Sequence, residues 1–246
     1  TATGHNIIDV AAASKRNIVV CNASGYSTAS TAQHAIALLL ELSNHCGDYH
    51  QSVSQGDWTR SGSWSYSRKP TLELADLTLG IIGLGTIGKQ VAKIAGALDM
   101  KVIANKRSQS TGIIDGVQIV ALEELYKTSD VISLHCPLND ESHEMINCRT
   151  LSYMKPTALI INTGRGGLIN ERDLKKALTE GIIAGAALDV LQDEPPEINH
   201  PLIGLPNCII TPHVAWGSKA SRSRLLDITL ENVQSFIGGR PQNSVN

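Results

Sequence analysis

The sequence predicts a doubly wound α/β protein, in which helices cover both faces of a parallel sheet. Beyond Leu77, short apolar runs alternate with helical segments, an arrangement typical of βαβ units with parallel strands. A G-x-G-x-x-G pattern joins the first of these strands to the first helix, at residues 83–88. We expect this domain to span residues 25–216, with 1–24 and 217–246 forming the remnant of a second, smaller domain.

The expected elements follow the chain in order. A short β-branched strand at 18–20 precedes an Ala/Leu-rich helix at 30–43, and residues 52–70 have the composition of an extended surface loop. A helix at 86–98 would place its apolar residues on one face, against the sheet. The remaining strands are expected at 79–82, 101–104, 131–134, 158–161, 183–188 and 208–210, and the remaining helices at 122–127, 171–180 and 219–237.

Bulk properties favour none of several function classes. A net charge of -2 gives no electrostatic reason to expect nucleic acid or an anionic membrane as a partner, because both need a basic face. The longest apolar stretches fall short of the roughly 20 residues that cross a bilayer. Five cysteines without CxxC spacing indicate free thiols in a reducing compartment, so a cytoplasmic location is expected. Because the chain opens without a start methionine or a helix cap, we also expect the N-terminal part of the second domain to be missing.

The glycine pattern predicts a dinucleotide site. Gly83 permits a sharp turn, Gly85 lets the backbone approach a pyrophosphate, and Gly88 lets helix and strand pack closely. Thr86 and Ile87 open the helix, whose N-terminal N–H groups and dipole attract a phosphate.

The end of the second strand indicates which nicotinamide cofactor is preferred. An acid that binds a ribose 2'-hydroxyl is expected about 20 residues after the glycine loop. The chain instead carries Lys106 and Arg107 there. Two cations suit a 2'-phosphate, which favours NADP over NAD. The alternative is that both side chains belong to a solvated turn, which would only weaken the discrimination between NAD and NADP.

Three polar residues follow successive strands. Arg165 stands among glycines, Glu194 follows the strand at 183–188, and His213 follows the strand at 208–210. Loops at the carboxyl ends of parallel strands meet over one crevice, so these side chains are candidates to converge. A guanidinium can bind a carboxylate or carbonyl, and a histidine beside a carboxylate can give a proton to a developing alkoxide. Taken singly, each could be an ordinary surface or core residue.

The other histidines show no metal-ligand spacing, and no metal is expected. His135 differs in ending a strand. Those expected to be surface residues are His5, His34, His45, His50, His143 and His200.

Together these motifs resemble the D-isomer-specific 2-hydroxyacid dehydrogenase family over the whole chain. Besides the glycine loop, the matching segments are His135-Cys136-Pro137-Leu138, Asn162-Thr163-Gly164-Arg165-Gly166-Gly167, Leu188-Asp189-Val190 with Glu194-Pro195, and Pro212-His213. The resemblance implies a Rossmann-type cofactor domain. It also implies that Arg165 binds substrate and polarises its carbonyl, that His213 donates and accepts the proton, and that Glu194 holds His213.

Further roles are implied by the resemblance alone. Asp189 would contact the carboxamide of the nicotinamide, and the backbone at Cys136, Pro137 and Thr163 would line the cofactor. Backbone at Thr3 and Gly4 would cradle the substrate carboxylate. Family members dimerise through the cofactor domain, which implies a homodimer with the helix from Ser30 and its following loop as an arm.

Within the family, the segments 2–6, 25–28, 33–34, 39–42, 56–58 and 213–218 are most similar to glycerate dehydrogenases, also called hydroxypyruvate reductases. The expected reaction passes a hydride between NAD(P)H and a small 2-keto or 2-hydroxy acid, and the resemblance implies conversion of hydroxypyruvate or glyoxylate to D-glycerate or glycolate. Two alternatives stay open. One is a dehydrogenase of another 2-hydroxy acid such as phosphoglycerate, and the other is a cofactor-sensing, corepressor-like binding protein.

Overall fold

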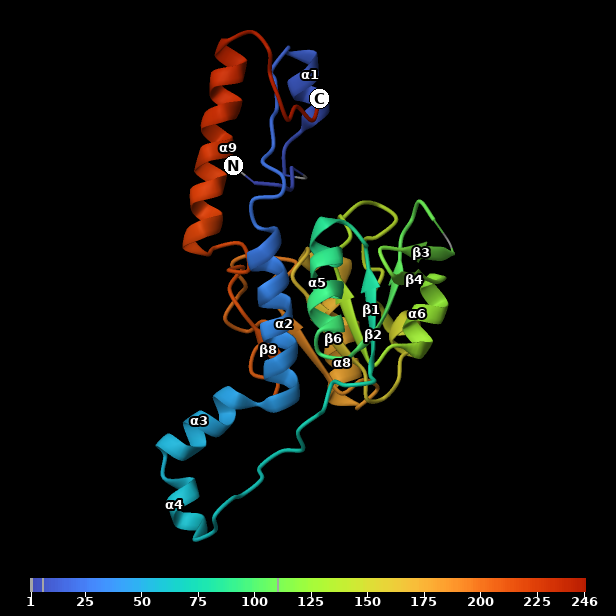
Figure 1. Ribbon diagram of the computed structural model, residues 1–246, viewed down its shortest axis with the longest axis vertical. Helices are drawn as coiled ribbons and strands as arrows, with labels where there is room; N and C mark the ends of the chain where they lie inside the picture. Colours follow the sequence, from blue (N-terminus) through green and yellow to red (C-terminus); the bar gives the residue numbers. More distant parts are fainter. Residues whose placement is uncertain (1, 6, 110) are drawn as a thin grey trace.

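A computed structural model describes residues 2–5, 7–109 and 111–246 (Figure 1). Thr1 and Asn6, which are predicted to belong to the remnant of the second domain, lie outside the described residues. An eight-stranded sheet has the order β3-β4-β2-β1-β5-β6-β7-β8, and β3–β4 is its antiparallel pair. The strands are β1 Thr78–Ile82, β2 Lys101–Asn105, β3 Gly112–Ile114, β4 Val117–Ile119, β5 Val131–Leu134, β6 Leu159–Asn162, β7 Gly185–Leu188 and β8 Cys208–Ile210.

Helices cover both faces of this sheet, so the predicted doubly wound fold is confirmed. The sequence patterns did not predict α1, α7 or the β3–β4 hairpin. The helices are α1 Val10–Lys15, α2 Thr28–Asn44, α3 Cys46–Ser54, α4 Asp57–Ser61, α5 Thr86–Gly96, α6 Leu122–Thr128, α7 Cys148–Leu151, the 3-10 turn η1 Gly166–Leu168, α8 Glu171–Thr179 and α9 Lys219–Ile237.

Two apolar cores lie on opposite faces of the sheet. Ile160 packs in the core shared with α6 and α8, whereas its neighbours Leu159 and Ile161 pack in the core shared with α2 and α5. This division follows from the period of two in a strand, which sends successive side chains to opposite faces. Burying each such side chain stabilises the fold by about 2 kcal/mol. The two cores fix the carboxyl ends of the strands on which the site is built.

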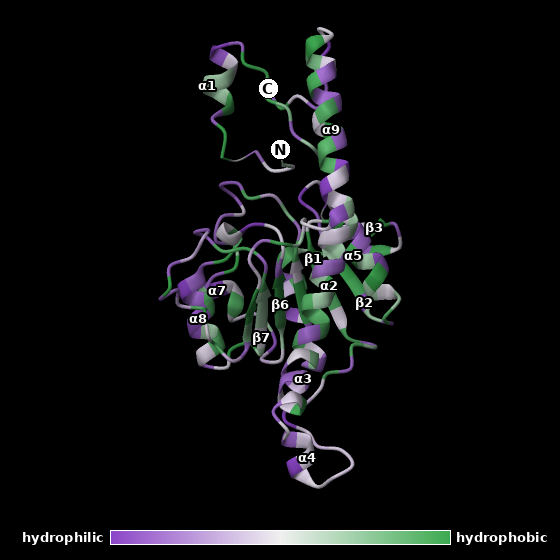
Figure 2. Ribbon diagram, turned by 90° about the vertical axis from the view of Figure 1, so that its left-hand side faces the viewer, coloured by the Kyte–Doolittle hydropathy of each residue, from purple (hydrophilic) through white to green (hydrophobic). Residues whose placement is uncertain are grey.

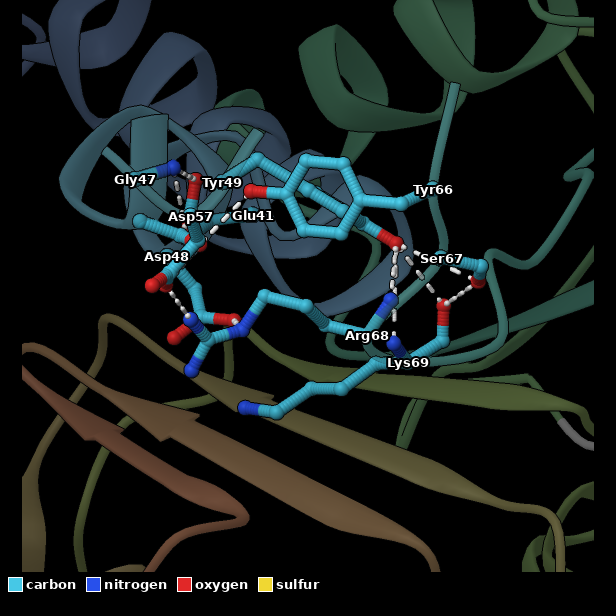
Figure 3. A network of polar contacts seen from close by, with 10 residues as sticks. Glu41, Gly47, Asp48, Tyr49, Asp57, Tyr66, Ser67, Arg68 and Lys69 are labelled. Carbon is cyan, nitrogen blue, oxygen red and sulfur yellow. Dashed lines mark hydrogen bonds and ion pairs between the residues drawn. The ribbon is translucent and has the colours of Figure 1, made fainter. Parts of the chain in front are cut away.

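The predicted extended loop at 52–70 is wrong in part, because it begins in α3 and contains α4. Polar contacts hold this segment, as Figure 3 shows. Arg68 pairs with Asp48 at 3.4 Å and with Asp57 at 3.0 Å, and the Tyr49 hydroxyl donates to the Lys69 carbonyl at 3.1 Å. The composition suggested a loop because these contacts, not apolar periodicity, stabilise the short helices.

The predicted strand at 18–20 is wrong. A strand needs a neighbour along its length, whereas among the described residues the strand-like pairing here is an isolated bridge between Cys21 and Ser244 of the C-terminal tail. Val20 N–H donates to the Asn246 side chain at 2.8 Å, and Val20 O accepts from Val245 N at 2.9 Å.

The N-terminal segment, α9 and the C-terminal tail lie together beyond one end of the sheet (Figures 1 and 2). Ala23 and Tyr26 pack against Leu225 of α9. The domain boundaries near 25 and 216 stay a prediction. No helix in the described part of the chain is both long and apolar enough to cross a membrane.

Candidate active site

A cleft of about 1410 Å³ opens at the carboxyl ends of β1, β2 and β5. From β1 the chain continues to β2 on one side and later to β5 on the other, so the direction of strand addition changes here. Doubly wound sheets bind their ligands at this point. Most of the predicted cofactor residues line it: Gly83, Gly85, Thr86, Lys106, Arg107, Cys136 and Pro137.

The glycine loop has the shape that a pyrophosphate requires. Gly83 has a φ of +100°, and a Cβ there would lie 2.6 Å from the backbone N of Cys136. A Cβ at Gly88 would overlap the carbonyl oxygen of Gly83, so this glycine permits the close approach of α5 to the loop. Gly85 caps α5 without a side-chain hydrogen bond, and a Cβ at this residue would meet no atom within 4 Å. Because the helix N-terminus is open to the cleft, the residues present fit a bound dinucleotide.

Charged side chains surround one end of the cleft. Arg107 pairs with Glu141 at 3.1 Å, and Lys89 pairs with Asp115 at 2.7 Å. The pKa of Asp115 is lowered mainly by Lys89, with a smaller contribution from Lys106. Both ion pairs are well exposed, so each contributes little to stability and can open for a ligand.

His135 and Cys136, which line the cleft directly after β5, are uncharged at neutral pH. Burial lowers the pKa of His135 to about 4, and its Nε2 lies 2.8 Å from the Ser133 hydroxyl, so the ring is neutral at pH 7. Burial raises the pKa of Cys136 to about 11, which keeps this thiol protonated and excludes it as a nucleophile.

His213 and Glu194 form a hydrogen-bonded couple. His213 Nδ1 lies 2.7 Å from Glu194 Oε2, and the other carboxylate oxygen accepts from Leu191 N at 3.0 Å. The two side chains are 42% and 34% exposed, so the couple is open to a small substrate. Because Nδ1 is hydrogen-bonded to Glu194, Nε2 is the ring nitrogen available for proton exchange with a substrate.

Asp189 anchors the loop that carries His213. Its carboxylate accepts from the Thr211 hydroxyl at 2.6 Å, from Val214 N at 2.9 Å and from Ala215 N at 2.8 Å. The Asp189 side chain has no exposed surface, so its contact with a nicotinamide carboxamide stays a prediction.

Arg165 lies in the loop after β6, beside the loop after β7. Asn162 fixes the backbone here, because its side chain donates to the Arg165 carbonyl at 2.9 Å. A Cβ at Gly166 would overlap the backbone of Leu191, so the two loops are in direct contact. The Thr163 hydroxyl is buried and has no hydrogen-bond partner within the described part of the chain, a feature that fits a ligand group at this position.

The structure therefore brings Glu194 and His213 together and places the Arg165 loop against the Glu194 loop. Thr3 and Gly4 lie in the N-terminal segment, where the Thr3 hydroxyl donates to the Ala23 carbonyl at 2.8 Å. Their predicted contact with substrate stays a prediction.

Two histidines were wrongly expected to be surface residues. His200 is 8% exposed and lies 2.9 Å from Glu171, whose other oxygen accepts from Gln192 N at 2.8 Å. His34 is half-buried and lies 3.0 Å from Thr211 Oγ1. Neither contact is predictable from local sequence, because the partner lies 177 positions away for His34 and 29 positions away for His200.

Comparisons with known proteins agree with this geometry. Residues 36–215 match the family model "D-isomer specific 2-hydroxyacid dehydrogenase, NAD binding domain". The chain is 44% identical to a hydroxypyruvate reductase of Blautia hydrogenotrophica, with 100% of this chain and 76% of the relative covered. It is 42% identical to a glycerate dehydrogenase of Methylorubrum extorquens, with 99% and 76% covered.

Solved structures show the same likeness. An NADPH-dependent glyoxylate/hydroxypyruvate reductase from Sinorhizobium meliloti, in complex with NADP and malonate, superposes with a TM-score of 0.88 at 30% identity, covering 99% of this chain and 75% of that one. A D-lactate dehydrogenase from Aquifex aeolicus, complexed with NAD and lactic acid, superposes with a TM-score of 0.85 at 32% identity, covering 97% and 75%.

Proposed function

Because this chain belongs to the D-isomer-specific 2-hydroxyacid dehydrogenase family, we propose that it reduces hydroxypyruvate or glyoxylate to D-glycerate or glycolate. Among the relatives, one at 44% identity is a hydroxypyruvate reductase and one at 39% identity is a glyoxylate reductase. The observation that carries the proposal is the His213–Glu194 couple at 2.7 Å, at the end of the sheet where Arg165 also lies.

The proposed chemistry assigns one task to each residue. The Arg165 guanidinium binds the substrate carboxylate and carbonyl oxygen, which orients the keto carbon and increases its electrophilicity. A bound NAD(P)H supplies the hydride. His213 gives the proton on Nε2 to the substrate oxygen as negative charge develops, and Glu194 stabilises the imidazolium that precedes this transfer. In the oxidative direction, His213 accepts the proton.

The proposal includes a preference for NADP. Gly83, Gly85 and the N-terminus of α5 would hold the pyrophosphate, and Lys106 and Arg107 would bind a 2'-phosphate. Both cations line the cleft, which supports this assignment. Among the similar structures, an imino acid reductase is in complex with NADPH and D-lactate dehydrogenases with NAD, so the preference depends on this chain's own residues.

A homodimer is also proposed, with α2, α3 and α4 as the arm. Figure 1 shows α3 and α4 extending away from the sheet, which suits a segment that reaches a second copy. All five cysteines are free, which fits the expected cytoplasmic location.

Steady-state assays test the reaction. We expect NADPH-dependent reduction of hydroxypyruvate and glyoxylate to exceed that of phosphohydroxypyruvate, which is included because a D-3-phosphoglycerate dehydrogenase of Archaeoglobus fulgidus is 37% identical. His213→Ala should lower kcat by about a hundredfold or more, the scale for losing a general acid. Lys175→Ala, at an exposed position of α8, is the control. Unchanged turnover in His213→Ala would exclude the proposed mechanism.

A further inference from the structure

We propose that His34 is a positioning residue for His213 and acts through Thr211 and Asp189. His34 lies on α2, and its Nε2 is 3.0 Å from Thr211 Oγ1 and 3.3 Å from Asp189 Oδ1. The inference rests on the proposed function, because His213 is the residue whose placement His34 would control.

The hydrogen positions in this cluster follow from its donors and acceptors. The Thr211 hydroxyl has one hydrogen, which it donates to Asp189 Oδ1 at 2.6 Å. Toward His34, the Thr211 oxygen can therefore only accept. A carboxylate also only accepts. His34 must carry a hydrogen on Nε2, so it donates toward Thr211 and Asp189.

Burial makes this donor important. The Asp189 side chain has no exposed surface, and a buried carboxylate is costly unless hydrogen bonds or a counter-charge compensate it. Within the described residues, His34 is the ionisable side chain that pairs with Asp189. Thr211, Val214 and Ala215 supply the other hydrogen bonds, so removing His34 would weaken the anchor that these residues share.

The shared anchor sets the position of His213. Thr211 and Val214 flank His213 in the chain, and both are held by the Asp189 side chain. His213 N also donates to the Asp189 carbonyl at 2.8 Å. Its φ of +52° is one that residues other than glycine rarely adopt, so the backbone must be held there. A shift of Thr211 or Asp189 would move the His213 ring relative to Glu194.

Two substitutions separate hydrogen bonding from packing. His34→Leu occupies a similar space but has no hydrogen-bond donor, whereas His34→Gln retains an N–H donor. With hydroxypyruvate, His34→Leu should lower kcat about tenfold, the scale of a small misplacement of a catalytic group. The Kd for NADPH, measured by nicotinamide fluorescence, should change much less than kcat in both variants, because the glycine loop lies on another part of the sheet. His34→Gln should restore most of the lost turnover. Equal turnover in wild type and both variants, or equal loss in both, would overturn the proposal.

A second readout needs no turnover. We expect His34→Leu to accelerate amide hydrogen exchange at Val214 and Ala215 and to shift the ¹⁵N signals of the His213 ring, while the amide of Ile161 in β6 exchanges as in wild type. Exchange and ring signals identical to wild type would refute the positioning role. If His213→Ala retains full turnover, the proposed function fails, but these measurements still decide whether His34 holds the loop.

Discussion

Gly166 packs directly against the backbone of Leu191, with no room for a side chain between them. This contact joins the loop after β6, which carries Arg165, to the loop after β7, which carries Glu194. Leu191 also donates its N–H to Glu194 Oε1 at 3.0 Å. One backbone contact therefore sets the spacing between the proposed substrate-binding arginine and the carboxylate that holds His213.

Gly166→Ala should accordingly destabilise the protein and impair turnover. The added methyl group would force the two loops apart, and overpacking of this kind costs about 2 kcal/mol. Gly96→Ala is the matched control, because a Cβ at this last residue of α5 meets no atom within 4 Å. Urea unfolding and kcat measure both effects. A Gly166→Ala variant with wild-type stability would show that the loops are not tightly packed in solution.

Glu194→Gln should lower kcat on the order of a hundredfold while changing the KM for the keto acid little, because a neutral amide cannot stabilise the imidazolium. Glu197→Gln removes a charge from an exposed side chain of the same loop and should leave both constants unchanged. Initial rates over a range of hydroxypyruvate concentrations separate the two constants. An equal effect of both substitutions would indicate a general charge effect in place of a specific contact with His213.

Local patterns predicted the parts of the fold that local interactions determine. The glycine loop was identified because Gly83 and Gly88 serve one turn between consecutive elements. The strand predicted at 18–20 failed because a β-branched run forms a strand only where a neighbour is available. The hairpin of β3 and β4 was missed because each strand has only three residues, too few for a periodic pattern.

The places of Arg165 and His213 in the fold were predictable, because each follows the end of a strand that local patterns identify. The supporting contacts were not predictable where a side chain crosses from another part of the chain. His34 and His200 looked like surface residues because their acidic partners, Asp189 and Glu171, come close only when the sheet has formed. Side chains that support a site are therefore harder to find from sequence than the residues that they support.

Lys106→Ala and Arg107→Ala should each weaken NADPH binding about tenfold and leave NADH binding nearly unchanged, because each removes a charged partner of the 2'-phosphate only. Titration of nicotinamide fluorescence gives both Kd values. Lys101→Ala is the control, since this exposed lysine of β2 pairs with Asp76. Equal weakening for both cofactors would favour the alternative that residues 106 and 107 form a solvated turn.

The depressed pKa of His135 predicts a defined acid sensitivity. The folded protein binds a proton on this ring only near pH 4, whereas the unfolded chain binds it near the ordinary value of 6.5. The contribution of the neutral ring to stability is therefore fully present above pH 6.5 and is lost as the pH falls from 6.5 to 4. Over that interval the loss amounts to about 3 kcal/mol.

His135→Gln keeps a hydrogen-bonding group near Ser133 but cannot titrate, so its free energy of unfolding should fall less steeply between pH 6.5 and 4 than that of wild type. The exposed His50 should show no such effect in His50→Ala. Urea unfolding at several pH values in this interval measures the slopes. Parallel slopes for wild type and His135→Gln would mean that water reaches the His135 ring and that burial does not suppress its protonation.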